Sequence, residues 1–208
     1  MTATVVETQF ETVFKDQPLT LESGQTLSPV TVAYETYGSL NEAKDNVILI
    51  CHALSGDAHA AFTHKDKENS TGWWDNLIGP GKAIDTNTYY VICTNAIGSC
   101  MGSTGPNSID PKTGKQFGLD FPIITIGDMV NVQKAFLDAI GIQKLKAVIG
   151  GSMGGMQALE WSILYPEMMD QSIVIATTSK LSPQALAFGS VGRNAISSDP
   201  NWQNGHYY

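Results

Sequence analysis

Hydrophobic and polar positions alternate along two segments in the N-terminal part of the chain. Residues 8–14 and 30–36 both show this period of two, and in the second segment Val30, Val32 and Tyr34 fall on one side. A period of two is typical of a strand with one buried face. The pattern predicts an antiparallel pair of strands in the N-terminal part of the chain.

Further along, short uninterrupted apolar runs replace the alternation. Such runs are typical of central strands that are covered on both faces. They lie at residues 47–51, 89–94, 145–149 and 172–175. The long segment between the first two runs, Ala53–Thr88, is rich in Gly, His and Trp. It is too long for a simple connection, and we expect a functional or packing-rich loop with room for one short helix.

Three segments have a helical repeat of apolar residues instead. In residues 128–140, Asp128 can cap the start of the helix and Gly141 can close its end. The other two helices are expected at residues 153–165 and 183–196. Strands that alternate with helices predict an α/β fold, with a mostly parallel sheet flanked by helices.

The composition fits one globular domain that acts on small molecules. The chain has 208 residues, of which 42% are hydrophobic and 15% are charged, and its net charge is −8. This charge argues against nucleic acid or an anionic membrane as partner, because both are bound through clustered Lys and Arg. No secretory signal and no apolar run of about 20 residues are present. Because Cys51, Cys93 and Cys100 are odd in number and two of them fall in or beside strand-like runs, we expect free thiols and a cytoplasmic protein.

The strongest chemical signal is the motif G-x-S-x-G at Gly150, Ser152 and Gly154. It stands between an apolar run and a helical segment, which is the strand, turn and helix context of a nucleophile elbow. The motif therefore predicts Ser152 as an acylated nucleophile. The helix that begins there would aim the backbone N–H of Met153 at the reacting oxygen, as an oxyanion donor. The alternative is a glycine-rich helix cap that binds phosphate, but the segment lacks the spacing of a P-loop or a dinucleotide site.

A second oxyanion donor is expected from the loop after an earlier strand. The segment His52–Asp57 follows the apolar run that ends at Cys51, and the N–H of Leu54 is the candidate donor. His52 itself precedes the nucleophile, whereas the base follows it in this fold. We therefore predict a structural role for His52.

Other residues could bind metal or phosphate, but their context is incomplete. His59 and His64 have no H-E-x-x-H, C-x-x-C or third clustered ligand beside them, so no metal is predicted. The glycine-rich segments 79–82 and 98–105 lack the Lys-Ser/Thr ending of a phosphate loop. Turns and close packing are the expected roles for both.

With the Ser152 motif and the Leu54 loop in place, the chain resembles the homoserine O-acetyltransferases of methionine biosynthesis, within the α/β-hydrolase superfamily. The stretches that carry the resemblance are VAYETYGSLN, ICHALSGDAHA, GWWDNLIGPGKAIDT, YYVICTNAIGSCMGSTGP, FPIITIGDMV, IGGSMGGMQALEW and SDPNWQNGHYY. The resemblance implies a ping-pong reaction in which Ser152 takes an acetyl group from acetyl-CoA and passes it to L-homoserine. It implies no tightly bound cofactor, and a homodimer for the full-length enzyme.

The chain departs from the family's pattern after the nucleophile. The family's catalytic Asp and His lie beyond strands that this sequence does not contain, and the late His206 belongs to a polar run, so we do not assign it as the base. Residues 1–208 are accordingly predicted to be the N-terminal part of a single α/β-hydrolase domain, truncated after about the sixth strand, without lid helices and inactive alone. Such a truncation leaves an unpaired sheet edge and an uncovered apolar face on the 183–196 helix. Arg193 could pair the homoserine carboxylate, although solvent is the ordinary environment of an arginine.

The sequence leaves several functions open. A succinyl donor would make the protein a homoserine O-succinyltransferase, and a serine acceptor would make it a serine O-acetyltransferase. A hydrolase of the same fold and a non-catalytic remnant also stay open: the missing base favours a remnant, whereas the intact elbow favours a recent truncation. The elbow cannot separate these functions, because donor and acceptor choice depends on pocket contacts.

Overall fold

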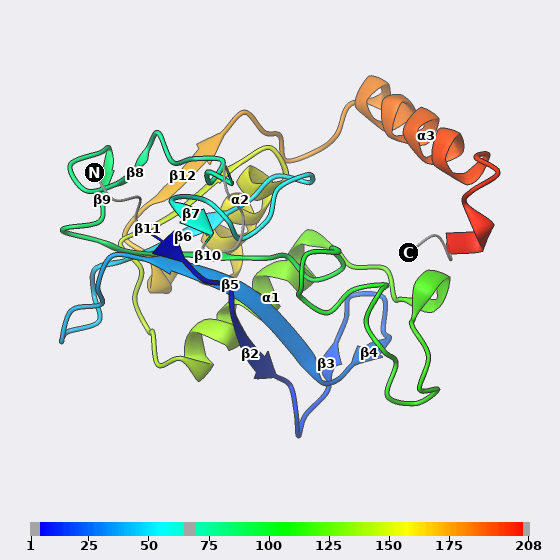
Figure 1. Cartoon of the computed structure of the whole chain (residues 1–208), viewed down its shortest axis with the longest axis horizontal. Coiled ribbons are helices and arrows are strands. Elements are labelled where there is room, and N and C mark those ends of the chain that lie inside the picture. The colour runs from blue at the N-terminus through cyan, green and yellow to red at the C-terminus, as the bar shows by residue number, and fades with distance from the viewer. Residues whose placement is uncertain (1–4, 65–69, 206–208) are drawn as a thin grey trace.

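The computed structural model describes residues 5–64 and 70–205, and its centre is a six-stranded sheet (Figure 1). The order of strands across the sheet is β12-β11-β6-β10-β5-β2. These strands are β2 (Gln9–Val13), β5 (Val30–Tyr37), β6 (Val47–Cys51), β10 (Tyr90–Thr94), β11 (Ala147–Gly151) and β12 (Ser172–Ile175). Short strands are β1 (Val5–Val6), β3 (Leu19–Thr20), β4 (Thr26–Leu27), β7 (Thr63–His64), β8 (Ile78–Gly79) and β9 (Ile84–Asp85). The helices are α1 (Ile126–Ala139), α2 (Met153–Leu164) and α3 (Pro183–Ser197), with 3-10 turns at Gly118–Asp120, Pro166–Met168 and Gln203–Gly205.

The sheet is mostly parallel, as the alternation of strands and helices predicts. Strand β6 pairs in parallel with β10 and β11, and β11 pairs in parallel with β12. Strand β5 pairs antiparallel with both β10 and β2, which confirms the predicted N-terminal pair. The carboxyl ends of β6 and β11 are therefore neighbours at one edge of the sheet, the position where ligands bind in open α/β sheets.

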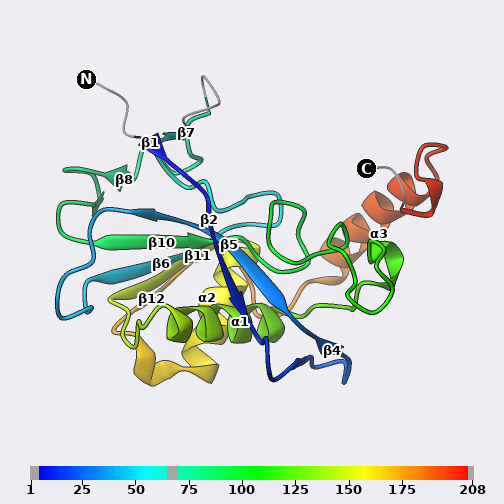
Figure 2. The ribbon, with the colours of Figure 1, turned by 60° about the horizontal axis from the view of Figure 1, so that its bottom comes forward.

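The two faces of the sheet are covered differently. Helices α1 and α2 pack together on one face, which holds the larger core cluster with Leu49, Phe136 and Trp161 (Figure 2). The other face is covered by the long segment after β6, where Ala60 and Ile78 are buried in the second core cluster. In the described part of this segment, the expected short helix is absent, and the regular structure there is β7, β8 and β9.

Strand β5 differs from its prediction in having both faces buried. Val30 and Val32 are buried on the expected side, but Ala33, Glu35 and Tyr37 on the other side are buried as well. Period-two alternation is usually caused by one solvated face. Here the polar positions of the second face are covered by the long segment, so a glutamate is buried inside the molecule.

Helix α1 begins earlier than predicted, and its cap is Thr125, not Asp128. The Thr125 hydroxyl accepts the Asp128 N–H at 3.1 Å, and the Asp128 carboxylate accepts the Thr125 N–H at 3.0 Å. This is a capping box, in which the acidic residue stands three positions inside the helix. The other oxygen of Asp128 accepts the N–H of Glu22 at 3.0 Å and so ties the helix to the N-terminal segment.

The C-terminal part of the described chain is exposed. Strand β12 forms one edge of the sheet, and Ile173, Val174 and Ile175 are 39%, 38% and 41% exposed. Helix α3 has no buried residue and is set apart from the sheet (Figure 1). Its apolar side chains include Phe188 at 69% exposure. The expectation of an unpaired edge and an uncovered helix is thus confirmed. None of the described helices has the length and apolar character required to cross a membrane.

Candidate active site

Ser152 stands at the turn between β11 and α2 with the backbone of a nucleophile elbow. Its φ is 55° and its ψ is −120°, a conformation that residues other than glycine rarely adopt. Strain of this kind costs on the order of 1–3 kcal/mol and persists only where the surroundings impose it. Three hydrogen bonds impose it here: Ser152 N–H to the Ile175 carbonyl at 3.1 Å, and the Thr177 hydroxyl and the Met156 N–H to the Ser152 carbonyl at 2.7 and 3.1 Å.

Glycines flank Ser152 because the helix approaches the sheet too closely for side chains. A Cβ atom at Gly150 would overlap the carbonyl oxygen of Gly154, and one at Gly154 would overlap that of Cys51. The N-terminus of α2 is therefore pressed onto the ends of β11 and β6. The sequence predicted β11 to end at Ile149, but the strand continues through Gly150 and Gly151 into the turn.

The segment after β6 forms an arch beside the elbow, which we define as residues 53–58. A cavity of about 580 Å³ is lined by both Leu54 and Met153, and a second cavity of about 630 Å³ is lined by Ser152. Ser55, Gly56 and Asp57 line both cavities, so the arch forms a shared wall between them. Both predicted oxyanion donors thus line one cavity, and the predicted nucleophile lines the neighbouring one.

The first N–H groups of a helix have no intrahelical acceptor, and Met153 is the first residue of α2. Its N–H is directed to the side where the helix dipole favours negative charge. The lining of the larger cavity adds the indoles of Trp73 and Trp74 to Ser152. The lining of the smaller cavity is mainly apolar beyond the arch, with Ile97, Phe121 and Met129 among its residues.

His52 is buried, and backbone groups occupy both of its ring nitrogens. Nε2 accepts the Ala96 N–H at 2.9 Å, so Nδ1 carries the proton and donates to the Ala53 carbonyl at 2.7 Å. Burial lowers the pKa of His52, which keeps the ring neutral. This arrangement agrees with the predicted structural role and leaves no nitrogen free to act as a base.

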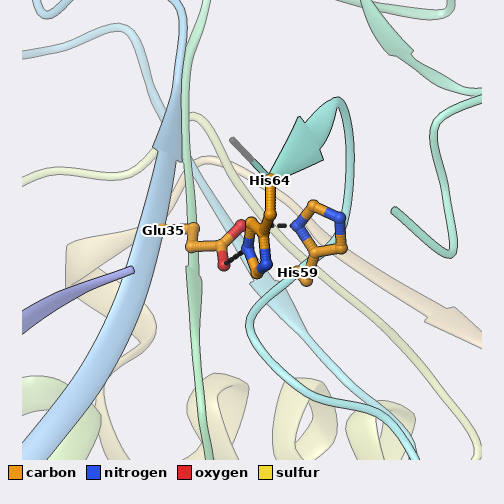
Figure 3. Close-up of side chains that lie close together, drawn as sticks. All are labelled: Glu35, His59 and His64. Atoms are coloured by element: carbon orange, nitrogen blue, oxygen red, sulfur yellow. Dashed lines mark hydrogen bonds and ion pairs between the residues drawn. The ribbon is translucent and has the colours of Figure 1, made fainter. Parts of the chain in front are cut away.

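His59 and His64 do have a third polar partner, which the sequence did not reveal. The buried carboxylate of Glu35 contacts Nδ1 of His59 at 2.9 Å and Nε2 of His64 at 2.7 Å (Figure 3). The one available signal was a charged residue inside the alternating run of β5. Glu35 is 24 residues from His59 in sequence, so spacing motifs could not reveal the cluster.

Arg193 lies away from the cavity of Ser152. It is exposed on α3, and its guanidinium donates to the Ser190 hydroxyl at 3.0 Å on the same helix. The described linings of both cavities include neither Arg193 nor any other residue of α3. Its assignment to a carboxylate therefore stays a prediction. His206, which we did not assign as a base, lies outside the described residues.

The glycine-rich segments make turns and packing contacts. Lys82 does not face an open phosphate cradle, because its ammonium contacts the carboxylate of Asp75 at 3.1 Å. The segment 98–105 closes on itself through the Gly98 N–H and the Thr104 carbonyl at 2.9 Å, and the Ser103 hydroxyl accepts the Ala33 N–H at 2.9 Å. The second segment is thereby tied to β5.

Comparison with known proteins agrees with this geometry. A family model described as the alpha/beta hydrolase fold matches residues 46–208. The chain is 56% identical over 98% of its length to a homoserine O-acetyltransferase of Methanococcoides burtonii, and 58% identical over 98% to one of Solidesulfovibrio magneticus. It covers 41% and 51% of those two proteins, so it spans about half the length of the curated relatives it matches.

Solved structures show the same likeness. A homoserine O-acetyltransferase from Bacillus anthracis has a TM-score of 0.87 at 40% identity, with 98% of this chain and 56% of that chain covered. The esterase E22 has a TM-score of 0.89 at 42% identity, with the same coverage. The family model matches residues 46–208, Ser152 has the strained backbone of an elbow, and glycines allow α2 to approach the sheet. The chain therefore belongs to the alpha/beta hydrolase fold family.

Proposed function

We propose that the full-length protein is a homoserine O-acetyltransferase, which moves an acetyl group from acetyl-CoA to the hydroxyl of L-homoserine. The observation that carries the proposal is Ser152, strained at the start of α2 and beside an arch that shares a cavity with that helix. An arrangement of this kind serves acyl transfer, since it exposes a nucleophile next to backbone N–H donors. The names of the relatives support homoserine and the acetyl group, and acetyl-CoA as donor is part of the proposal.

In this mechanism the Ser152 oxygen attacks the thioester carbonyl and its proton passes to a base. The negative oxygen of the tetrahedral intermediate accepts hydrogen bonds from the N–H groups of Leu54 and Met153. The intermediate collapses to acyl-serine as the C–S bond breaks and CoA leaves with a proton. The homoserine hydroxyl then attacks the acyl-serine carbonyl and gives its proton to the base. The bond between the acyl carbon and the Ser152 oxygen breaks, and the base returns the proton to that oxygen as O-acetylhomoserine leaves. A thioester suits this chemistry, because its exchange onto an alcohol depends more on oxyanion stabilisation than on protonation of the leaving group.

We further propose that the base comes from a part of the protein outside the described residues. Within residues 5–64 and 70–205 the imidazoles are those of His52, His59 and His64, and each contacts a hydrogen-bonding partner. The described residues alone are then expected to transfer no acetyl group. A transfer rate for residues 1–208 within about tenfold of that of an intact relative would contradict this part of the proposal. A cytoplasmic location and a homodimer stay predictions for the full-length protein.

A second candidate is ester hydrolysis, and the likeness to esterase E22 favours it. The two activities share the acyl-serine and differ in the acceptor, which is water in a hydrolase and homoserine in a transferase. Water competes with homoserine at the same intermediate, so the ratio of the two products distinguishes the functions.

The test is a matrix of donors and acceptors with the full-length protein. Acetyl-CoA and succinyl-CoA are each incubated with L-homoserine, L-serine or neither, and free CoA and O-acyl amino acid are measured. The proposal expects O-acetylhomoserine, ping-pong kinetics and slow CoA release without acceptor. Equal CoA release with and without homoserine would indicate a hydrolase, and a preference for succinyl-CoA or serine would change the assigned substrates. Ser152→Ala is the matched control and is expected to lower the rate at least about 10³-fold.

A further inference from the structure

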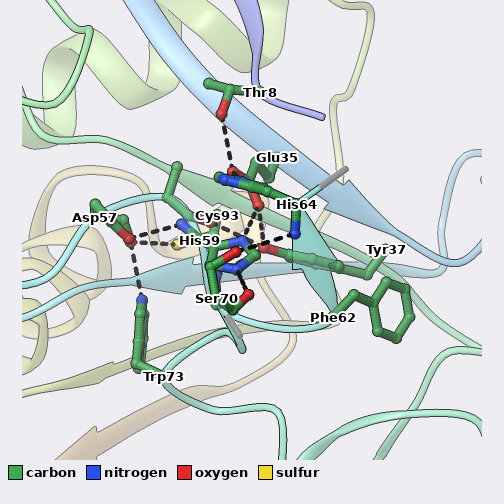
Figure 4. Close-up of polar contacts among 12 residues, drawn as sticks. Thr8, Glu35, Tyr37, Asp57, His59, Phe62, His64, Ser70, Trp73 and Cys93 are labelled. Atoms are coloured by element: carbon green, nitrogen blue, oxygen red, sulfur yellow. Dashed lines mark hydrogen bonds and ion pairs between the residues drawn. The ribbon is translucent and has the colours of Figure 1, made fainter. Parts of the chain in front are cut away.

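The side chain of Glu35 is a buried charged group near the candidate active site. It is 1% exposed on β5, and four side chains surround its carboxylate (Figure 4). The contacts are Thr8 Oγ1 at 3.0 Å and His64 Nε2 at 2.7 Å on Oε1, and Tyr37 OH at 2.8 Å and His59 Nδ1 at 2.9 Å on Oε2. A buried carboxylate without a positive partner is strongly destabilising.

Hydrogen-bond donors and acceptors around His59 identify that positive partner. Nε2 of His59 contacts the Ser70 carbonyl at 2.8 Å, and Nδ1 contacts the Glu35 carboxylate at 2.9 Å. A carbonyl and a carboxylate only accept hydrogen bonds, so both nitrogens must donate, which requires an imidazolium. Burial raises the pKa of Glu35, but hydrogen bonds from His59, His64 and Tyr37 together lower it by more. The pKa of Glu35 therefore lies below its usual value. Glu35 is therefore the anion of the pair.

A metal ion could in principle replace that proton, because the ligand atoms of Glu35, His59 and His64 lie within 4.8 Å of one another. The ring geometry argues against it. The two imidazoles are stacked with centroids 3.8 Å apart and planes at 41°. Two imidazoles that share one ion at about 2.1 Å point their nitrogens at a common centre, which places the ring centres roughly 5 Å apart. The stacked rings do not have that arrangement.

The ion pair holds one end of the arch that carries Leu54. At the start of the arch, His52 is fixed by the backbone of Ala96. At its end, the ring of His59 is held by Glu35, and the backbone N–H of His59 donates to the Asp57 carboxylate at 2.9 Å. The hydroxyl of Tyr37 accepts the Ala60 N–H at 2.8 Å. Between these two anchors, the Leu54 side chain is 80% exposed, so packing contributes little to its position.

We propose that Glu35 is a positioning residue for acyl transfer: its ion pair with His59 fixes the arch and thereby the place of the Leu54 oxyanion N–H. The inference rests on the proposed function in assigning that N–H to the oxyanion. An arch that lost this anchor would still admit substrate but would hold the donor away from the developing charge. Such a loss falls on the transition state, and so on kcat more than on KM.

The titratable groups near His59 come from several elements of the fold. They are Glu35 and Tyr37 on β5, Cys93 on β10, and Asp57, His64 and Asp75 on the long segment. Of these, Glu35 is the carboxylate that contacts the ring directly. Removing its charge is therefore the most specific perturbation.

The test compares Glu35→Gln with the exposed control Glu42→Gln in the full-length protein. Two quantities are measured: the kcat and KM of acyl transfer, and the second-order rate constant for phosphonylation of Ser152 by an aryl phosphonate. We expect Glu35→Gln to lower kcat and the phosphonylation rate at least about tenfold, with KM within about threefold and complete modification of Ser152 at long times. Complete modification excludes a mere loss of folded protein. Glu42→Gln is expected to match the wild type.

Should Glu35→Gln unfold the protein, the pair His59→Gln and His64→Gln decides. Both remove a contact to the same carboxylate, but only His59 stands directly at the end of the arch. A loss of at least about tenfold in the first and under about threefold in the second supports the proposal. Equal losses in both overturn it, as do rates for Glu35→Gln within about twofold of the wild type. One bound zinc per chain, lost together with activity on chelation, would also overturn it. A wild type that reacts with phosphonate but moves no acetyl group contradicts the proposed function alone, because the phosphonate comparison still decides the role of Glu35.

Discussion

The substitution Gly154→Ala tests the elbow most sharply, since it adds one methyl group where helix α2 meets β6. A Cβ there would overlap the Cys51 carbonyl oxygen, and ordinary contact begins near 3.4 Å. The start of α2 must therefore retreat by about 1 Å, and a displacement of that size at a reacting centre costs about 10²-fold in rate. Overpacking costs about 1–3 kcal/mol, while alanine regains about 1 kcal/mol of helix propensity. We expect a folded protein with a rate about 10²-fold lower.

The assay is the phosphonylation rate of Ser152 in the full-length protein, followed by mass spectrometry, together with the thermal midpoint of unfolding. The matched control is Gly192→Ala on the exposed helix α3, where a Cβ would meet no atom of the described residues within 4 Å. This control is expected to keep the wild-type rate and to gain up to about 1 kcal/mol of stability. The reasoning fails if Gly154→Ala reacts within about threefold of the wild type.

Three further predictions concern buried polar groups and thiols. The Trp161 indole N–H donates to the amide oxygen of Gln133 at 2.8 Å. Gln133→Leu leaves this N–H buried without an acceptor and should lower the free energy of unfolding by about 1–3 kcal/mol. A difference below about 0.5 kcal/mol in the free energy of unfolding by urea would contradict this. At mildly alkaline pH a thiol reagent should modify the exposed Cys100 first, since burial raises the pKa of Cys51 to about 12, and peptide mapping would show a labelled Cys51 if this is wrong. The pKa of Glu35 in the folded protein lies below its ordinary value of 4.5. The ionised Glu35 therefore stabilises the fold fully above pH 4.5, and this contribution is lost as the pH falls through the folded pKa. Glu35→Gln should therefore lose more stability at neutral pH than at low pH, and a constant difference in thermal midpoint would contradict the assignment.

The parts of the fold that depend on local pattern could be predicted from the sequence. The elbow is an example, because strand, turn and helix follow one another without a gap and the glycines report a close approach. Helix α1 was found from its periodicity, but its cap was not, since Asp128 can cap a helix or complete a capping box three positions inside it. The backbone angles of Thr125 and its two hydrogen bonds with Asp128 distinguish these two cases.

The long segment after β6 could not be predicted in the same way. It has no period, because it covers the sheet with small residues such as Ala60 and Ala61 and not with one face of a helix. For the same reason β5 was expected to have a solvated face, and the burial of Glu35 was missed. The cluster of Glu35 with His59 and His64 depends on contacts between distant segments, which no local spacing encodes.

We expect Ser152 to carry the acetyl group between donor and acceptor. The full-length protein is mixed with acetyl-CoA alone, digested, and the peptide that contains Ser152 is examined by mass spectrometry before and after addition of L-homoserine. We expect an acetyl group on Ser152 that disappears as O-acetylhomoserine forms. Formation of O-acetylhomoserine with no acetyl group ever on Ser152, or at an undiminished rate in Ser152→Ala, would contradict it.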